Sequence, residues 1–349
     1  MGITILASVF VFGLLVLFHE FGHFIIAKLS GIRVNQFAVG MGPVLLKKQK
    51  GETEYSLRLL PIGGFCAMEG EDDDSSDPRA FNKKPVWKRM GVVVAGPVMN
   101  LILGFILILI MTLIDGQVAT VKVSRFPVDE NEVSVSSSEM SGLQKDDVFY
   151  SINGRRILTD TDLSYQLQTT DSDTMQVVVK RNGEKVTLPN VTFFNKATEG
   201  RLDFYIWAEK PNFLNVIQYS FLDTISVGKM IWSSLADLLS GKYGFHDLSG
   251  PVGIVTTIGE AASYGETFKQ HLTSVLSLAS FITVNVGIFN LLPIPALDGA
   301  RLVFLVIEAI RRKPIPPEKE GMVHFAGMAV LFLLMIAVTY QDIARLIQG

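Results

Sequence analysis

The residues of this chain with the clearest chemical meaning are His19, Glu20 and His23, which stand in the run H-E-F-G-H. Two histidines four positions apart lie on one face of a helix, where both imidazoles can bind one zinc ion. A glutamate between them is the usual general base that takes a proton from zinc-bound water. The pattern therefore predicts hydrolytic chemistry at a zinc site.

The surroundings of this run strengthen the prediction. Between Ile3 and Ala27 the only ionisable side chains are His19, Glu20 and His23. One charged group at the centre of a bilayer costs roughly 2.5–3.5 kcal/mol, so three at ligand spacing indicate a function. The alternative is a polar contact between neighbouring helices, which is the less common role of such residues.

The hydrophobic residues of the chain are gathered into four stretches. Of 349 residues 48% are hydrophobic, and the stretches are residues 3–27, 92–114, 272–292 and 322–340. Each is long enough to cross the hydrocarbon core of a bilayer, which is about 30 Å thick. We therefore expect a polytopic α-helical membrane protein with four transmembrane helices.

Charge and cysteine content exclude several classes of protein. The net charge of −3 gives no indication of nucleic-acid binding. The single cysteine, Cys66, excludes an intrachain disulfide and a cysteine-cluster metal site, and we expect it to be a packed thiol.

Basic residues predict the orientation in the membrane. Residues 28–89 contain eleven Lys and Arg, and the loop between the last two apolar stretches is also basic. The positive-inside rule places both loops in the cytoplasm, and both termini and residues 115–271 outside. His19 lies 16 residues after Ile3, about 24 Å along a helix, so the metal site is expected within the membrane near its cytoplasmic side.

Four segments follow from this layout. Residues 1–114 and 271–349 are expected to form the two halves of a membrane core. Residues 115–210 have short β-type runs separated by Gly and Asn turns, as in a soluble domain. Residues 211–270 contain an amphipathic stretch that fits an interfacial helix better than a fifth span.

Residues 57–68 are too apolar for a free loop. Two apolar runs flank Pro61, Gly63 and Gly64, which predicts a hairpin or a re-entrant loop covered by protein. An ordinary surface hairpin is the alternative. The acidic run at 69–77 is expected to be a solvated linker without a chemical role.

A catalytic zinc site needs a third protein ligand and an open position for water. The candidate is Asp298, which follows the third apolar stretch after two helix-breaking residues, Pro293 and Pro295. The residues alone support equally well that Asp298 caps the next helix. His324 and Asn100, each within an apolar stretch, are interpreted as helix-packing residues. The less favoured alternatives are a ligand role for His324 and a catalytic role for Asn100.

Taken together, the motifs resemble the site-2 protease family, in particular its bacterial RseP-type branch of intramembrane zinc metalloproteases with a PDZ domain. The motifs are HEFGH, LPIGGF at 60–65, AGPVMN at 95–100, SGPVGI at 249–254 and NLLPIPALDG at 290–299. Residues 141–154 are similar to the core of a PDZ domain, with Asp146 in place of the usual glycine. The motifs span nearly the whole chain in order.

The resemblance implies roles for individual residues and a fold. It implies a Zn²⁺ ion bound by His19, His23 and Asp298, with Glu20 as the base. It also implies four transmembrane helices, a membrane-dipping β-hairpin and an inserted extracytoplasmic PDZ-like α+β domain.

Substrate contacts and function are implied in the same way. The segment with Gly63 and Gly64 would pair with substrate, and Asn290 would help to hold the substrate or the oxyanion. The expected function is an intramembrane zinc endopeptidase of regulated intramembrane proteolysis in the bacterial inner (plasma) membrane. Its partners would be the lipid bilayer and single-span membrane proteins, such as anti-sigma factors or remnant signal peptides.

Two other functions are compatible with parts of the pattern. A non-proteolytic scaffold would use the PDZ-like region for binding, but it would not need an intact HEFGH run and Asp298. A zinc transporter would use similar ligands, but it would line several spans with polar metal-binding residues, and residues 92–114 and 272–292 contain no ionisable side chain.

Overall fold

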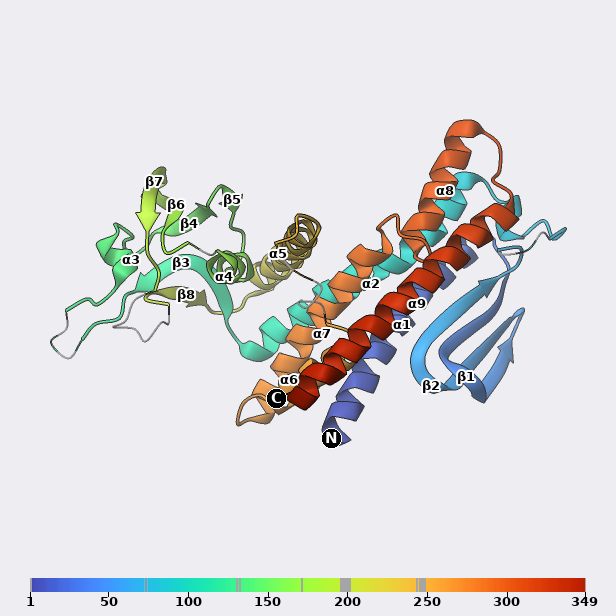
Figure 1. Cartoon of the computed structure of the whole chain (residues 1–349), viewed down its shortest axis with the longest axis horizontal. Helices are drawn as coiled ribbons and strands as arrows, with labels where there is room; N and C mark the ends of the chain where they lie inside the picture. Colours follow the sequence, from blue (N-terminus) through green and yellow to red (C-terminus); the bar gives the residue numbers. More distant parts are fainter. Residues whose placement is uncertain are drawn as a thin grey trace. The chain divides into compact units, whose positions relative to one another are not determined.

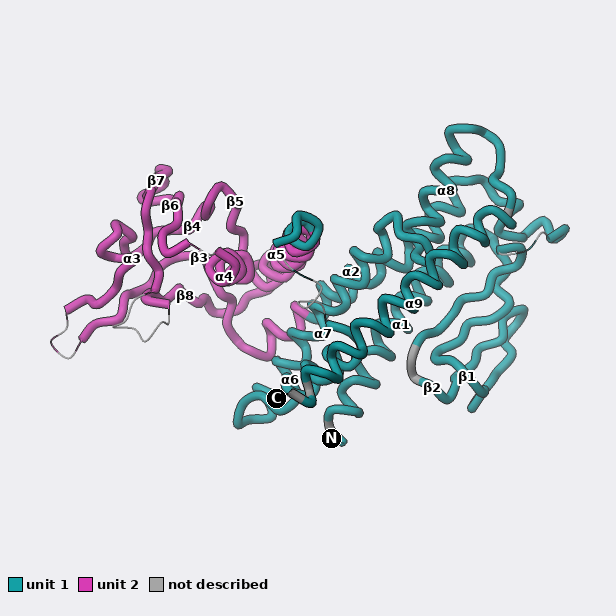
Figure 2. The backbone as a smooth tube through the Cα atoms, viewed as in Figure 1, with its two compact units in different colours: residues 1–107, 236–349 teal, residues 108–235 magenta. Residues whose placement is uncertain are grey.

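The computed structural model (Figure 1) describes residues 2–71, 73, 75–129, 131, 133–170, 172–194, 202–242, 244 and 249–348. The chain divides into two compact units (Figure 2). Unit 1 comprises residues 1–107 and 236–349, and unit 2 comprises residues 108–235. We describe each unit by itself.

Four helices of the described chain are long and apolar enough to cross a membrane: α1 (Gly2–Leu29), α2 (Val86–Asp115), α7 (Phe268–Asn290) and α9 (Pro317–Gln348). They coincide with the four predicted stretches, so the prediction of four helices long and apolar enough to span a membrane is confirmed, and the fold is compatible with a polytopic membrane protein. Large apolar side chains lie on the surface of α9, among them Phe332, Leu333 and Ile336. A surface of this kind is compatible with lipid and is unfavourable in water.

Glycines allow the helices around α2 to approach one another closely. A Cβ atom at Gly22 of α1 would lie 2.3 Å from the carbonyl oxygen of Ala95 in α2. One at Gly104 of α2 would lie 2.4 Å from Val284 of α7. Small residues at such crossings let backbones touch, which is the main source of helix association in a bilayer.

Two shorter helices complete unit 1, α6 (Pro251–Ser263) and α8 (Asp298–Arg311). The first turn of α6 is held by the Asp342 carboxylate of α9, which accepts hydrogen bonds from the backbone N–H of Gly250 at 3.0 Å and Gly253 at 2.8 Å. A carboxylate at a helix N-terminus satisfies otherwise unpaired donors and favours the helix dipole. This contact fixes the C-terminal part of α9 to α6.

Unit 1 also contains a long hairpin of β1 (Val34–Lys50) and β2 (Thr53–Met68), followed by a short 3₁₀ helix, η1 (Phe81–Lys83). The turn of this hairpin is at residues 51–52, where Gly51 has a positive φ of 61°. The prediction of a turn at Pro61–Gly64 is therefore wrong in position, because residues 61–64 belong to β2. The Pro and Gly residues instead mark a change of pairing partner within the strand.

Both strands bend so that β1 pairs with β2 twice (Figure 1). Residues 34–39 of β1 pair with 64–68 of β2 on one side, residues 36–39 also pair with 54–57 on the other, and 44–50 pair with 53–58. Residues 64–68 are thus paired on one side only among the described residues, and we call them the edge strand. An edge strand carries backbone groups that can pair with another chain.

Unit 2 is built on an antiparallel sheet with the strand order β7-β6-β4-β3-β8, and β5 pairs with β4. Its strands are β3 (Val118–Arg125), β4 (Val148–Ile152), β5 (Arg155–Arg156), β6 (Met175–Arg181), β7 (Glu184–Val191) and β8 (Tyr205–Glu209). Its helices are α3 (Ser137–Met140), α4 (Asp160–Thr169) and α5 (Phe213–Leu239). Asp146 has a φ of 71°, a conformation that glycine adopts readily, so aspartate keeps the turn expected for glycine.

Buried carboxylates join α4 to α5 in unit 2. Asp223 of α5 accepts a hydrogen bond from the hydroxyl of Thr159 at 2.8 Å. Asp160 of α4 accepts one from the Tyr219 hydroxyl at 2.9 Å, and Asp162 of α4 pairs with Lys229 at 2.8 Å. Burial raises the pKa of Asp223 to about 6, and the charges of Asp160 and Asp162 contribute. The pair of helices therefore favours a protonated Asp223.

This raised pKa predicts how stability depends on pH. The folded protein holds the proton of Asp223 more tightly than the unfolded chain, whose Asp pKa is about 3.9. The contribution to stability is therefore full below about pH 4 and is lost as the pH rises through about 6, with a total of roughly 3 kcal/mol. Thermal unfolding of the protein in detergent at several pH values between 4 and 7 measures this loss of stability. Asp223→Asn should flatten the profile, whereas the control Asp237→Asn should not; an unchanged profile in Asp223→Asn would contradict the assignment.

Candidate metal centre

Three predicted ligands from two distant parts of the chain meet in unit 1. The Nε2 atoms of His19 and His23 on α1 lie 3.2 Å apart. Oδ2 of Asp298, at the start of α8, lies 3.2 Å from Nε2 of His19 and 3.5 Å from Nε2 of His23. One ligand atom from each residue can be chosen so that all lie within 4.8 Å of one another. All three side chains are largely buried.

Backbone and side-chain contacts orient both imidazoles. Nδ1 of His23 lies 2.8 Å from the carbonyl oxygen of Val92 and donates to it, which leaves the Nε2 lone pair facing the cluster. Asn100 of α2 is fully buried, with its amide nitrogen 3.3 Å from Nδ1 of His19 and its Oδ1 without a partner. Turning this amide by 180° lets Oδ1 accept the Nδ1–H of His19, which gives Oδ1 a partner and frees Nε2 for a metal.

The donor set fits a divalent cation. Oδ2 of Asp298 is buried without a hydrogen bond of normal geometry, and it points at two imidazole nitrogens. Three lone pairs that face one another repel unless a cation lies between them, and two histidines with one carboxylate are a common zinc donor set. Asp298 is the first residue of α8, and the N-cap position belongs to Leu297. The alternative that Asp298 is the cap of this helix is therefore wrong.

The expected base lies at the same place. Glu20 lines a cavity of about 410 Å³ together with His19, His23 and Asp298. The edge strand forms another wall of this cavity, through Phe65, Cys66, Ala67 and Met68. The Glu20 carboxylate accepts a hydrogen bond from the backbone N–H of Cys66. The three predicted ligands, the Glu20 carboxylate and the edge strand therefore line the same cavity.

The remaining predicted residues have different positions. A Cβ atom at Gly64 would lie 3.2 Å from Cγ of Glu20 and 2.8 Å from Val16, so only glycine lets the edge strand pass this close to α1. Gly63 has a φ of 77°, which favours glycine. Asn290 is the last residue of α7 and does not line the cavity of the cluster, so its role in substrate binding stays a prediction. Cys66 is a buried thiol, as expected.

A glycine of α2 that was not singled out lies directly against the histidines. A Cβ atom at Gly96 would lie 2.3 Å from Nε2 of His23 and 2.9 Å from Cε1 of His19. Loss of a residue that orients a metal ligand typically lowers metal affinity roughly 10–100-fold. We expect Gly96→Ala to lower zinc affinity by at least this factor, because its methyl group would displace both imidazole rings. Zinc titration of the purified protein measures this effect.

Gly91→Ala is the matched control on the same helix. A Cβ atom there meets only Ile26, at the ordinary contact distance of 3.8 Å. Equal zinc affinity in the two variants would contradict the close approach of Gly96 to the imidazoles.

Asn100, for which a catalytic role is the alternative to helix packing, contacts His19. One further residue at the site was not predicted from the sequence. Glu71, placed in a solvated linker, lines the cavity and forms an ion pair with Arg301 of α8. The linker prediction is therefore wrong at Glu71. His324 was correctly placed away from the cluster: its Nδ1 accepts the backbone N–H of Ala296 at 3.1 Å.

The sequence of the chain is similar to those of known zinc metalloproteases. The profile of peptidase family M50 matches residues 7–334 of the chain. The chain is 33% identical to the "Regulator of sigma-W protease RasP" of Bacillus subtilis (strain 168), with 98% of this chain and 99% of the relative covered. It is 32% identical to the "Zinc metalloprotease RasP" of Bacillus licheniformis, with the same coverage. The chain belongs to peptidase family M50, the site-2 protease family, and is a membrane zinc metalloprotease.

Proposed function

We propose that the protein is an endopeptidase that cuts transmembrane segments within the bilayer, with His19, His23 and Asp298 as zinc ligands and Glu20 as general base. The observation that carries this proposal is the edge strand at the wall of the cavity that contains these four residues. Peptide bonds of a transmembrane helix are hidden by their own hydrogen bonds. A substrate segment that unwinds and pairs with the edge strand presents its carbonyl groups beside the ligands.

Different residues of the chain have different roles in peptide hydrolysis. Bound zinc supplies the Lewis acidity that polarises the scissile carbonyl and acidifies water. Glu20 takes the proton of the attacking water and passes it to the leaving amine nitrogen. The contacts of His23 with Val92, and of His19 with Asn100, hold the imidazoles in the tautomer that leaves Nε2 free.

We also propose the cellular setting. The protein lies in the bacterial plasma membrane, with the metal centre near the cytoplasmic face and the PDZ-like region of residues 115–210 on the outer face; the basic loops support this orientation. The hairpin of β1 and β2 exposes Leu45, Leu46 and Leu59, which fits a segment that dips into lipid. A relative is named for regulation of sigma-W, so single-span anti-sigma factors are candidate substrates, and remnant signal peptides are a second class.

Cleavage of single-span peptides in vesicles tests the proposal. The purified protein should cut such a peptide inside its apolar segment, lose this activity with a chelator, and regain it with zinc. A matched pair of peptides, one with Gly and Pro in the apolar segment and one with Leu and Ala only, tests the unwinding step. The first should be cut faster, because its helix opens more easily. Cuts only outside the apolar segment would contradict the proposal.

A further inference from the structure

One face of α8 carries contacts that link this helix to the metal centre and to the hairpin. Asp298, Arg301, Leu305 and Glu308 follow one another at spacings of three and four residues, and therefore lie on the same side of the helix. Leu305 is buried in the core cluster that contains Cys66 and other residues of the hairpin. The same face of α8 therefore carries the proposed zinc ligand Asp298, the charged residues Arg301 and Glu308, and the buried Leu305.

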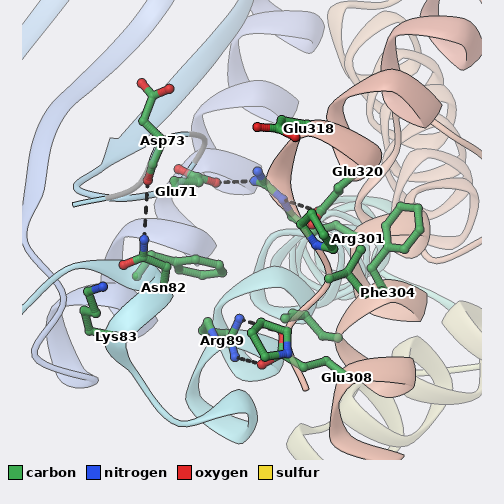
Figure 3. A pocket seen from close by; sticks show the side chains of 15 residues that line it. Glu71, Asp73, Asn82, Lys83, Arg89, Arg301, Phe304, Glu308, Glu318 and Glu320 are labelled. Atoms are coloured by element: carbon green, nitrogen blue, oxygen red, sulfur yellow. Dashed lines mark hydrogen bonds and ion pairs between the residues drawn. The ribbon is translucent and has the colours of Figure 1, made fainter. Parts of the chain in front are cut away.

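Arg301 is tied to the end of the edge strand (Figure 3). Its guanidinium forms a short ion pair with Glu71, whose other oxygen accepts the backbone N–H of Met68 at 3.3 Å. Met68 is the last residue of β2. Arg301 also donates from Nε to Glu320 of α9 at 3.4 Å. A single side chain, three residues after Asp298, therefore reaches the edge strand through one intermediate carboxylate.

The surroundings make this ion pair stronger than a surface pair. The side chains of Arg301 and Glu71 are 23% and 16% exposed, and the guanidinium lies 6.0 Å from the centre of the buried Phe81 ring. Both residues line the cavity of the metal centre and also a neighbouring cavity of about 740 Å³ (Figure 3). A pair that is largely shielded from water resists separation, because each charge would be left without its partner.

We propose that Arg301 is a positioning residue which, through Glu71, fixes the register of the edge strand relative to Asp298 and so selects the peptide bond that is cut. The inference rests on the proposed function. A strand advances about 3.3 Å per residue, so a small shift of the edge strand changes which carbonyl of a paired substrate lies at the ligands. A slip of two residues keeps the same side chains on the same face of the strand.

The position of the cut is the most direct test. We use a single-span peptide that the wild-type enzyme cuts at one major bond, and determine product masses. Arg301→Gln should lower kcat/KM about tenfold or more, in line with the cost of misplacing a substrate by an ångström, and should add cuts at neighbouring bonds. Glu71→Gln should give the same set of cuts. The double variant should be no worse than either single one, because both remove one interaction.

The matched control breaks the other ion pair on the same face of α8. Arg89 donates to Glu308 through both terminal nitrogens, one of them at 3.0 Å, and neither residue lines the cavity of the metal centre. Arg89→Gln should lower stability and leave the cut at the wild-type bond. Arg301→Lys, which keeps the charge, should restore part of the preference for one bond.

Hydrogen exchange gives a readout that does not depend on cleavage. In the zinc-loaded protein, exchange in the segment of residues 64–71 should be at least about tenfold faster in Arg301→Gln than in wild type, and unchanged in Arg89→Gln. An unaltered cut site together with unaltered exchange in Arg301→Gln would overturn the inference. Absence of cleavage by the wild-type enzyme, with the exchange difference present, would instead overturn the proposed function and leave the coupling of Arg301 to the strand established.

Discussion

Replacing Glu20 by glutamine should abolish peptide cleavage while zinc stays bound. An amide cannot take the proton of the attacking water, and general-base catalysis contributes about 10²–10⁴-fold to rates. Glutamine keeps the shape of the side chain, and its oxygen can still accept the backbone N–H of Cys66 that Glu20 accepts in the structure. The measurements are kcat on a single-span peptide and zinc content per protein.

The comparison variant for this prediction is Glu71→Gln, the same chemical change at another carboxylate of the cavity. It should shift the cut and reduce the rate, and it should not abolish turnover. Residual activity of Glu20→Gln above a few per cent of wild type would remove Glu20 from the role of base.

Asp298→Ala should lower zinc occupancy as well as activity. The substitution removes one of the three donors that converge at the site, so the loss of affinity should exceed the roughly 10–100-fold typical of a supporting residue. Competition with a chelator of known affinity measures it. Glu20→Gln should retain zinc in the same assay. The difference between the two variants would distinguish a zinc ligand, Asp298, from the general base, Glu20.

A second substitution at the same position separates a metal role from a helix-terminal role. Asp298 is the first residue of α8, where a negative charge also favours the helix dipole. Asp298→Ser keeps a small polar group suited to the start of a helix and removes the carboxylate. If both variants held stoichiometric zinc and lost only thermal stability, Asp298 would be a structural residue of α8.

The sequence predicted those features that depend on local patterns. Four apolar stretches became α1, α2, α7 and α9, because the length of an apolar run decides whether a helix can cross a bilayer. The two histidines were predicted to share a face because their spacing matches the helical period. The approach of Asp298 to the two histidines could be seen only in the folded chain, since these residues are almost 280 positions apart in the sequence.

What the sequence missed depends on contacts between distant elements. Glu71 stands in an acidic run, which is usually solvated, and its role became visible only where Arg301 of α8 reaches it. The sequence around Gly96 is that of an ordinary apolar helix, and only the folded chain shows that the His23 ring packs against this glycine. The sequence predicts the hairpin turn at Pro61–Gly64 because glycine and proline usually mark turns, whereas here they let one strand bend between two partners.

The attachment of α9 links the metal centre to the thickness of the membrane. This helix is joined to its neighbours near one end by Glu320, which accepts from Arg301, and near the other by Asp342, which caps α6. Only 6% of the residues in its most apolar stretch are buried by the rest of the protein, so most of the surface of this stretch is free to contact lipid. The two attachments are 22 residues apart, about 33 Å along a helix, close to the roughly 30 Å of a bilayer core. A bilayer of another thickness is accommodated by tilting or kinking such a helix, and either change would move Glu320 relative to Arg301, next to the residues proposed as zinc ligands.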